Sequence, residues 1–297
     1  MTERRSTADI ADGIDLSGKA CVITGASSGL GRESARALAA AGAHVILAAR
    51  NQDALTQTAD WIAAEVPGAR TSTVHLDLTT LAGVRAAATA IRDLTPVIHV
   101  LMNNAGVMFT PFGRTQDGFE LQIGTNHFGH FELTRLLVPQ LAAAGGARLV
   151  ILSSGGHVMG DVDFDDPHWG NREYDKFVAY GASKTANILH AVEADRRLCE
   201  MGIRAYAVHP GTVATSLGRY MSRSDFSHLR KLASGHLDVT TPEYGAATQV
   251  WAAVSPELAD QGGLYVEDCR ISEAASYASD KRRATALWDL SEKLCGP

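Results

Sequence analysis

The chain has 297 residues, 45% of them hydrophobic, and a formal net charge of −6. This is enough apolar material for a sizeable core, and an acidic balance without a long basic cluster argues against nucleic acid as a partner. The four cysteines form no C-x-x-C pair, which favours free thiols in a reducing cytoplasm. No apolar run predicts a transmembrane helix, and the polar first 15 residues do not resemble a secretory signal. We therefore expect no membrane partner.

Strands and helices alternate along the chain. This alternation is typical of a doubly wound parallel sheet of the Rossmann type, an α/β fold with helices on both faces. The expected strands are Ala20–Thr24, His44–Ala48, Thr71–Leu76, Val97–Met102, Arg148–Leu152, Arg204–Val208 and Gly263–Val266. The expected helices are Arg32–Ala41, Asp53–Glu65, Leu81–Leu94, Phe119–Ala144, Phe177–Met201 and Pro242–Val254.

The domain organisation follows from the absence of any Gly/Pro/Ser-rich linker. We expect a flexible N-terminal lead-in over residues 1–15 and a single domain over residues 16–297. Two segments, residues 155–175 and 215–241, break the alternation of strands and helices. Long irregular loops in compact domains are commonly functional, so we expect both to be active-site loops at the carboxyl ends of strands.

The stretch Thr-Gly-Ala-Ser-Ser-Gly-Leu-Gly at residues 24–31 joins the first strand to the first helix. Glycines there let backbone N–H groups approach a diphosphate at the positive end of the helix. The expected contacts are Gly25, Ser27, Ser28, Gly29, Leu30 and Gly31.

The same turn also matches the G-x-S-x-G nucleophile turn of α/β-hydrolases. That turn needs an earlier strand and loop to complete its oxyanion hole, yet only about twenty mostly polar residues precede it here. The order of elements therefore favours a nucleotide.

Arg50 stands at the end of the second strand, 19 positions after Gly31. Folds that prefer NAD place an acid about there, which binds the ribose 2′-hydroxyl. Here the pair is Ala49-Arg50, and an arginine can bind a 2′-phosphate. We therefore expect NADP(H) to be preferred, with NAD(H) as a possible second cofactor.

Tyr180 and Lys184 share one face of a helix because they are four residues apart. A nearby ammonium and an oxidised nicotinamide would both favour the phenolate form of the tyrosine. Tyr180 could then exchange a proton with an alcohol or carbonyl oxygen. Ser153 or Ser154, at the end of the fifth strand, could hydrogen-bond the same oxygen.

Together these motifs resemble the short-chain dehydrogenases/reductases, over residues from about Leu16 to Gly263. The motifs are Thr24-x-x-x-Gly29-x-Gly31, Asn103-Asn104-Ala105-Gly106, Asn126 in Asn126-His127-Phe128-Gly129, Ser153-Ser154, Tyr180-x-x-x-Lys184 and Pro210-Gly211. The branch that holds retinol dehydrogenase and protochlorophyllide reductase is the most similar one. That similarity lies in Gly118-Phe119-Glu120, in residues 125–131 and in residues 183–187.

The resemblance implies a role for each matching residue. Tyr180 would be the catalytic acid and base, Lys184 would hold the ribose and lower the tyrosine pKa, and Ser154 would polarise the substrate oxygen. Asn126 would anchor a water that links Lys184 to solvent. Further contacts to the nucleotide would come from Asp77, Leu78, Asn104, Ala105, Gly106, Pro210, Gly211, Val213 and Thr215.

The insertion at residues 155–175 separates Ser154 from Tyr180 by 26 positions, about twice the usual distance in the simplest members of the family. It contains Asp161, Asp163 and Asp165, which mimic the opening of a calcium loop. Because the glycine and the closing glutamate of such a loop are absent, we expect a solvated acidic loop and no metal.

The combined expectation is an oxidoreductase that interconverts a secondary alcohol and a carbonyl on a hydrophobic or aromatic small molecule. Two alternatives stay open: reduction of a carbon–carbon double bond, and a non-catalytic dinucleotide-binding sensor or scaffold. The resemblance also implies a homodimer or homotetramer that pairs through helices 119–144 and 177–201. The apolar residues expected in the substrate pocket are Val158, Met159, Leu217, Tyr220, Met221 and Phe226.

Overall fold

The computed structural model describes residues 4–232 and 238–296, except for the side chains of His228 and Leu232. These residues form an eight-stranded sheet in the order β10-β9-β6-β5-β4-β1-β2-β3. Neighbouring strands are parallel, except that β10 is antiparallel to β9. The strands are β1 (Ala20–Thr24), β2 (His44–Ala49), β3 (Arg70–His75), β4 (Val100–Asn103), β5 (Ala147–Leu152), β6 (Ile203–His209), β9 (Leu264–Glu267) and β10 (Arg270–Ser272).

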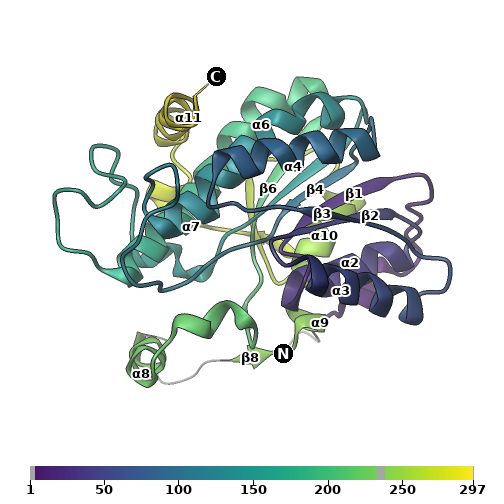
Figure 1. Ribbon diagram of the computed structural model, residues 1–297, viewed down its shortest axis with the longest axis horizontal. Helices are drawn as coiled ribbons and strands as arrows, with labels where there is room; N and C mark the ends of the chain where they lie inside the picture. Colours follow the sequence, from purple (N-terminus) through teal and green to yellow (C-terminus); the bar gives the residue numbers. More distant parts are fainter. Residues whose placement is uncertain (1–3, 233–237, 297) are drawn as a thin grey trace.

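Helices cover both faces of this sheet, so the predicted doubly wound α/β fold is confirmed (Figure 1). One face carries α2 (Gly29–Ala40), α3 (Gln52–Glu65) and α10 (Ala247–Val254). The other carries α4 (Leu81–Leu94), α6 (Gly129–Ala142) and α7 (Lys176–Leu198), with α11 (Lys281–Cys295) packed outside them.

The central strands read as continuous apolar runs because both faces are buried. Alternate side chains along β1 enter opposite cores: Val22 packs on the α4 and α6 side, whereas Cys21 and Ile23 pack on the α2 side. The strand order reverses between β1 and β4, and ligands of open parallel sheets bind in the crevice at such a point.

The expected flexible lead-in contains an ordered helix, so the prediction is wrong for residues 4–15. Here α1 (Thr7–Ala11) begins with a capping box between Ser6 and Asp9. Thr7 and Ile10 are buried, and the Thr7 hydroxyl donates to Glu33 on α2. Docking against α2 and α10 therefore orders a segment whose sequence shows little apolar pattern.

The helix expected over residues 119–144 begins at Leu121 and changes its winding. A short α5 (Leu121–Ile123) passes into the π-helical turn η1 (Gly124–Phe128) and then into α6. Turns of this kind are rare and frequently lie at functional sites. Asn126 lies within this one.

The segment at residues 215–241 holds a 3₁₀ turn η4 (Ser216–Tyr220), helix α8 (Arg223–Leu232) and strand β8 (Val239–Thr240), which pairs with β7 (Thr212–Val213). The rest of the structure is formed by α9 (Pro242–Gly245) and the 3₁₀ turns η2 (Gly155–Met159), η3 (Cys199–Met201), η5 (Pro256–Leu258) and η6 (Ser276–Ala278).

The C-terminal helix α11 was not predicted, although its buried residues Ala284, Leu287, Trp288, Ser291 and Cys295 follow a helical period. Its Trp288 ring lies 5.0 Å from the Phe131 ring of α6, and Arg197 of α7 stacks on the same indole at 5.0 Å. Pairing of two chains through this face of α6 and α7 would have to displace α11.

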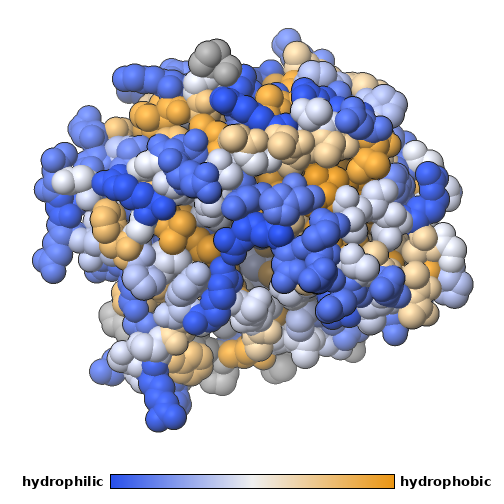
Figure 2. All heavy atoms as spheres, viewed as in Figure 1, coloured by the Kyte–Doolittle hydropathy of each residue, from blue (hydrophilic) through white to orange (hydrophobic). Residues whose placement is uncertain are grey.

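Hydrophilic side chains dominate the face shown in Figure 2, with smaller hydrophobic groups between them. Among the described residues, no helix combines the length and apolarity needed to cross a bilayer.

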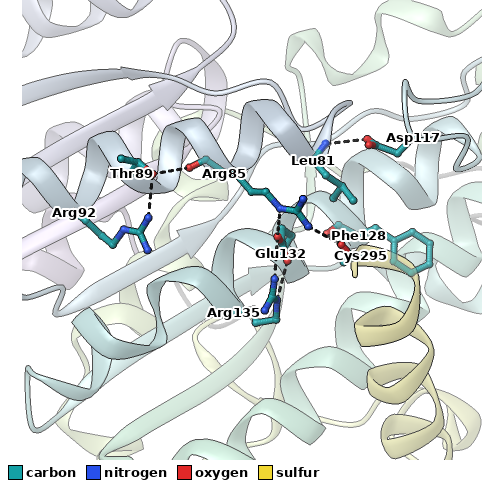
Figure 3. A network of polar contacts seen from close by, with 9 residues as sticks. All are labelled: Leu81, Arg85, Thr89, Arg92, Asp117, Phe128, Glu132, Arg135 and Cys295. Atoms are coloured by element: carbon teal, nitrogen blue, oxygen red, sulfur yellow. Dashed lines mark hydrogen bonds and ion pairs between the residues drawn. The ribbon is translucent and has the colours of Figure 1, made fainter. Parts of the chain in front are cut away.

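A buried carboxylate joins α4, α6 and α11 (Figure 3). Glu132 is fully buried and accepts from Arg85 and Arg135, in each case with an Nε–O distance of 2.8 Å. Arg85 also donates to the carbonyl of Cys295 at 2.7 Å, which ties the end of α11 to α4.

We expect Glu132→Ala to lower the free energy of unfolding by about 2 kcal/mol, because Arg85 and Arg135 both lose the buried carboxylate as an acceptor. The measurement is urea denaturation. Arg92→Ala on the exposed face of α4 is the control and should change stability by less than about 0.5 kcal/mol. Equal effects of the two substitutions would contradict this role of Glu132.

Candidate active site

A cavity of about 1250 Å³ opens at the carboxyl ends of the central strands. It is larger than the usual drug-sized pocket and can take a dinucleotide together with a substrate. Its wall contains every predicted site residue except Asn126. Those residues are Gly25, Ser27, Ser28, Gly29, Leu30, Gly31, Arg50, Asp77, Leu78, Asn104, Ala105, Gly106, Ser154, Tyr180, Lys184, Pro210, Gly211, Val213 and Thr215.

In the glycine turn at residues 25–31, Gly25 and Gly31 have no room for a side chain. A Cβ on Gly25 would lie 2.9 Å from the Ala105 Cα, and one on Gly31 would lie 2.4 Å from the Gly25 carbonyl oxygen. Ser28 is the N-cap of α2 but its side chain caps no backbone N–H, and no acidic residue lies in the first turn. The positive end of α2 therefore fits a diphosphate.

Hydrogen bonds between Thr24 and residues 104–105 hold this turn against the end of β4. The Thr24 hydroxyl oxygen accepts from the backbone N–H groups of Asn104 and Ala105, both at 2.9 Å. The Asn104 amide donates to the Thr24 carbonyl at 2.7 Å. The side chain of Asn104 thus joins the ends of β1 and β4, in addition to lining the cavity.

Arg50 is exposed at the end of β2, and no described residue forms a hydrogen bond or ion pair with its guanidinium. A free guanidinium on the cavity wall, without a neighbouring carboxylate, fits a 2′-phosphate. Asp77 also lines the cavity, but its carboxylate accepts from the backbone and hydroxyl of Thr79 at 2.9 and 2.8 Å.

Tyr180 and Lys184 meet Ser154 in the deep part of the site. Both α7 side chains are buried, and the Ser154 side chain approaches the Tyr180 hydroxyl closely enough to favour its ionised form. The Ser154 Oγ accepts from the Gly156 N–H at 3.0 Å, which leaves its own proton to donate. The Ser153 hydroxyl instead donates to the Lys184 carbonyl at 2.8 Å. Of the two serines, Ser154 is therefore the one that faces the phenol.

Burial controls the charges at this site. It raises the pKa of Tyr180 to about 12, against the opposing hydrogen bond with Ser154, and lowers the pKa of Lys184 to about 8. The Lys184 Nζ lies 5.7 Å from the Tyr180 ring centre and donates to the Leu152 carbonyl at 3.0 Å. Desolvation thus acts against the lowering of the tyrosine pKa that was expected from Lys184.

Asn126 is fully buried beside the cavity and does not line it. Its side-chain oxygen accepts from the Val107 N–H at 2.8 Å, and its amide donates to the Val107 carbonyl and the Ser183 hydroxyl at 2.9 Å. Its backbone carbonyl accepts from His130 Nδ1 at 3.0 Å. The side chain thus holds the Val107 segment, and the expected water-anchoring role stays a prediction.

Apolar side chains line the part of the cavity where the sequence predicts the substrate, together with Arg219 and Arg223. Of the six predicted residues, Val158, Met159, Leu217, Met221 and Phe226 line it, and Tyr220 does not. Residues that were missed include Thr125 and His209. His209 could have been found because it directly precedes Pro210-Gly211.

The segment after β7 lies across the glycine turn. The hydroxyl groups of Ser216 and Ser28 are 3.3 Å apart, and a Cβ on Gly29 would contact Thr215 at 3.1 Å. The loop that lines the substrate end therefore also contacts the nucleotide end.

The acidic loop is paired with arginines. Asp161 lies 2.7 Å from Arg283, and Arg172 contacts Asp163 and Asp166 at 3.3 and 3.7 Å. Within residues 4–232 and 238–296, no group of three or more His, Cys, Asp or Glu side chains is arranged to hold a metal ion.

Comparison with known proteins agrees with this geometry. Residues 19–225 match the family model described as short chain dehydrogenase. Retinol dehydrogenase 13 from Homo sapiens is 39% identical over 283 residues, which cover 95% of this chain and 86% of that protein.

Two solved structures extend the comparison. An uncharacterized protein from Mycobacterium Paratuberculosis superposes with a TM-score of 0.77 at 34% identity, covering 99% of this chain and 98% of that one. L-sorbose reductase from Gluconobacter frateurii, complexed with NADPH and L-sorbose, has a TM-score of 0.67 at 25% identity, with coverages of 85% and 95%.

The chain belongs to the short-chain dehydrogenase/reductase family, so the predicted family and its retinol-dehydrogenase-like branch are confirmed. It is a nicotinamide-dependent oxidoreductase.

We expect Lys184→Met to be at least as stable as the wild-type chain at about pH 7 without nucleotide. A folded-state pKa of about 8, below the ordinary 10.5, means that the unfolded chain binds more protons between these values. Wild-type stability therefore rises with pH over this interval, and the advantage of the variant shrinks. The Leu152 carbonyl keeps a donor in Asn187, at 2.8 Å.

The measurement is urea denaturation of both proteins at about pH 7 and about pH 9. A variant that is less stable than wild type at the lower pH, with a deficit that narrows at the higher pH, would contradict the burial cost assigned to Lys184.

Proposed function

We propose that the protein uses NADP(H) to interconvert an alcohol and a carbonyl on a hydrophobic or aromatic small molecule. The observation that carries this proposal is the convergence of the Ser154 and Tyr180 hydroxyls with the Lys184 ammonium, in the same cavity as the glycine turn. When bound, the nicotinamide supplies or accepts the hydride.

The residues of the chain supply orientation and the proton. Ser154, whose oxygen already accepts from Gly156, donates a hydrogen bond to the substrate oxygen and keeps its proton. In the reducing direction Tyr180 passes its proton to that oxygen, and in the oxidising direction it takes the proton back. Lys184 and the positive charge of an oxidised nicotinamide would both favour the phenolate and so offset the effect of burial.

The apolar lining at Val158, Leu217 and Phe226 supports a hydrophobic substrate. The name of the human relative supports an alcohol of the retinol kind. Primary alcohols and aldehydes therefore belong in a substrate panel beside the secondary alcohols and ketones that the sequence led us to expect.

The alternatives differ in what they need from Tyr180 and Ser154. A reductase of carbon–carbon double bonds would convert enones to saturated ketones, which product analysis separates from carbonyl reduction. A sensor or scaffold would bind NADPH without turnover and would need no buried proton donor. The expected homodimer or homotetramer and the cytoplasmic location stay predictions.

We expect Tyr180→Phe to lower kcat by at least roughly a hundredfold, because it removes only the transferable proton. NADPH affinity, measured by fluorescence titration, should stay close to wild type. The control is Tyr244→Phe, the same chemical change at an exposed tyrosine. Turnover retained by Tyr180→Phe on every substrate of the panel would remove Tyr180 from the mechanism.

We expect Arg50→Ala to raise the KM for NADPH by roughly tenfold to a hundredfold and to change the KM for NADH little, since only NADPH carries the 2′-phosphate. Arg50→Lys keeps the charge without the bidentate fork and should fall between the two. Equal catalytic efficiency with both cofactors, unaltered in Arg50→Ala, would refute the NADP preference.

A further inference from the structure

Phe109 has a backbone conformation that is uncommon for a bulky side chain. Its φ is +53°, in the left-handed region, and its side chain is 1% exposed. Such residues persist only where the surrounding structure holds them, and they cluster at functional sites. Phe109 also lies on the wall of the cavity. Its conformation therefore needs an explanation from its contacts.

The ring of Phe109 packs against the ring of Tyr180. The two ring centres are 5.1 Å apart with an interplanar angle of 71°, an edge-to-face arrangement. The centre of the Phe109 ring also lies 4.6 Å from that of Phe177, about one helical turn before Tyr180. A phenol packed in this way has little freedom to rotate away from Ser154.

Gln122 holds the backbone of Phe109. The Phe109 N–H donates to Gln122 Oε1 at 2.8 Å, and Gln122 Nε2 donates to the Tyr174 hydroxyl at 2.8 Å and to the Lys176 carbonyl at 2.9 Å. Gln122 is fully buried. Because Phe109 needs an acceptor and Lys176 needs a donor, only one orientation of the amide satisfies all three partners.

The network ends on a buried carboxylate. The Tyr174 hydroxyl donates to Glu120 Oε1 at 2.9 Å. Glu120 also accepts from the backbone N–H groups of Gln122 and Ile123, both at 2.9 Å. Every member is hydrogen-bonded, and a fully satisfied buried network specifies one arrangement. The network joins the Phe109 loop to the first residue of α7, the helix that carries Tyr180.

We infer that Phe109 is a positioning residue for the Tyr180 phenol and that the Gln122 amide fixes it in the left-handed conformation. The inference rests on the proposed function, because it assumes that Tyr180 transfers the proton. Neither Phe109 nor Gln122 supplies a proton to the reaction. Their effect is on the orientation of the group that does.

The test compares two variants. One removes the Phe109 ring that packs on Tyr180, and the other removes the hydrogen bond to Gln122 that holds the Phe109 backbone. Phe109→Leu removes the ring but keeps an apolar γ-branched side chain on the same backbone. Gln122→Met keeps the ring and the volume of the glutamine but releases the Phe109 N–H. We expect each to lower kcat by roughly tenfold to a hundredfold, the effect of a small misplacement of a reacting group.

Two further readouts and a control variant separate positioning from general damage. NADPH affinity should stay within about twofold of wild type, since most of the residues predicted to contact NADPH lie elsewhere in the cavity. The solvent deuterium isotope effect on kcat should increase, because proton transfer becomes slower relative to the other steps. Phe112→Leu is the control, since Phe112 is on the same loop, is exposed and stacks on Tyr174 rather than Tyr180.

Wild-type kcat in both variants would overturn the inference, and so would a loss without any change in the isotope effect or an equal loss in Phe112→Leu. Thermal unfolding checks that each variant folds, and if one does not, the other decides. Tyr180→Phe, measured in parallel, separates a failure of the proposed function from a failure of the present inference. If it stays active, the proposed function fails; if it is inactive while Phe109→Leu is unaffected, only the present inference fails.

Discussion

The buried ammonium of Lys184 is the group on which the rest of the site depends. Removing an ammonium from water is unfavourable, and the lowered pKa of Lys184 is the measure of that cost. The Leu152 carbonyl at the end of β5 gives it one acceptor. The fold can hold this charge because a large apolar core on both faces of the sheet supplies the necessary stability. The site thus lies where an otherwise very stable sheet ends.

The two halves of the cavity are linked by hydrogen bonds that cross the sheet. Thr24 binds the turn after β4, and Asn104 binds back to Thr24, so the glycine turn and the Asn104–Gly106 segment form one unit. Asn126 then ties Val107, directly after this unit, to the helix that carries Ser183 and Lys184. The proposed nucleotide-binding and proton-transfer sites therefore share one continuous backbone segment, and the left-handed conformation of Phe109 falls where that segment meets Tyr180.

The fold and much of the site could be predicted because their signals are local. Apolar runs of strand length, glycines between a strand and a helix, and a Tyr/Lys pair at helical spacing are all visible in neighbouring residues. The choice between Ser153 and Ser154 could not be made in this way, because it depends on which hydroxyl lies beside the Tyr180 phenol and which donates to the backbone of α7. The role of Asn126 likewise depends on a π-turn whose sequence differs little from an ordinary helix.

The sequence by itself determined the order of strands and helices, the position of the glycine turn and the family of the protein, since each follows from residues close together in the chain. Three features were decided only by the tertiary structure. They are the formation of helix α1 against α2 and α10, the packing of α11 over α6 and α7, and the contact between Phe109 and Tyr180. These features join segments far apart in the chain, from Thr7 to Glu33 and from α11 to α4. Their stability comes from burial and hydrogen bonds that exist only once the sheet has assembled.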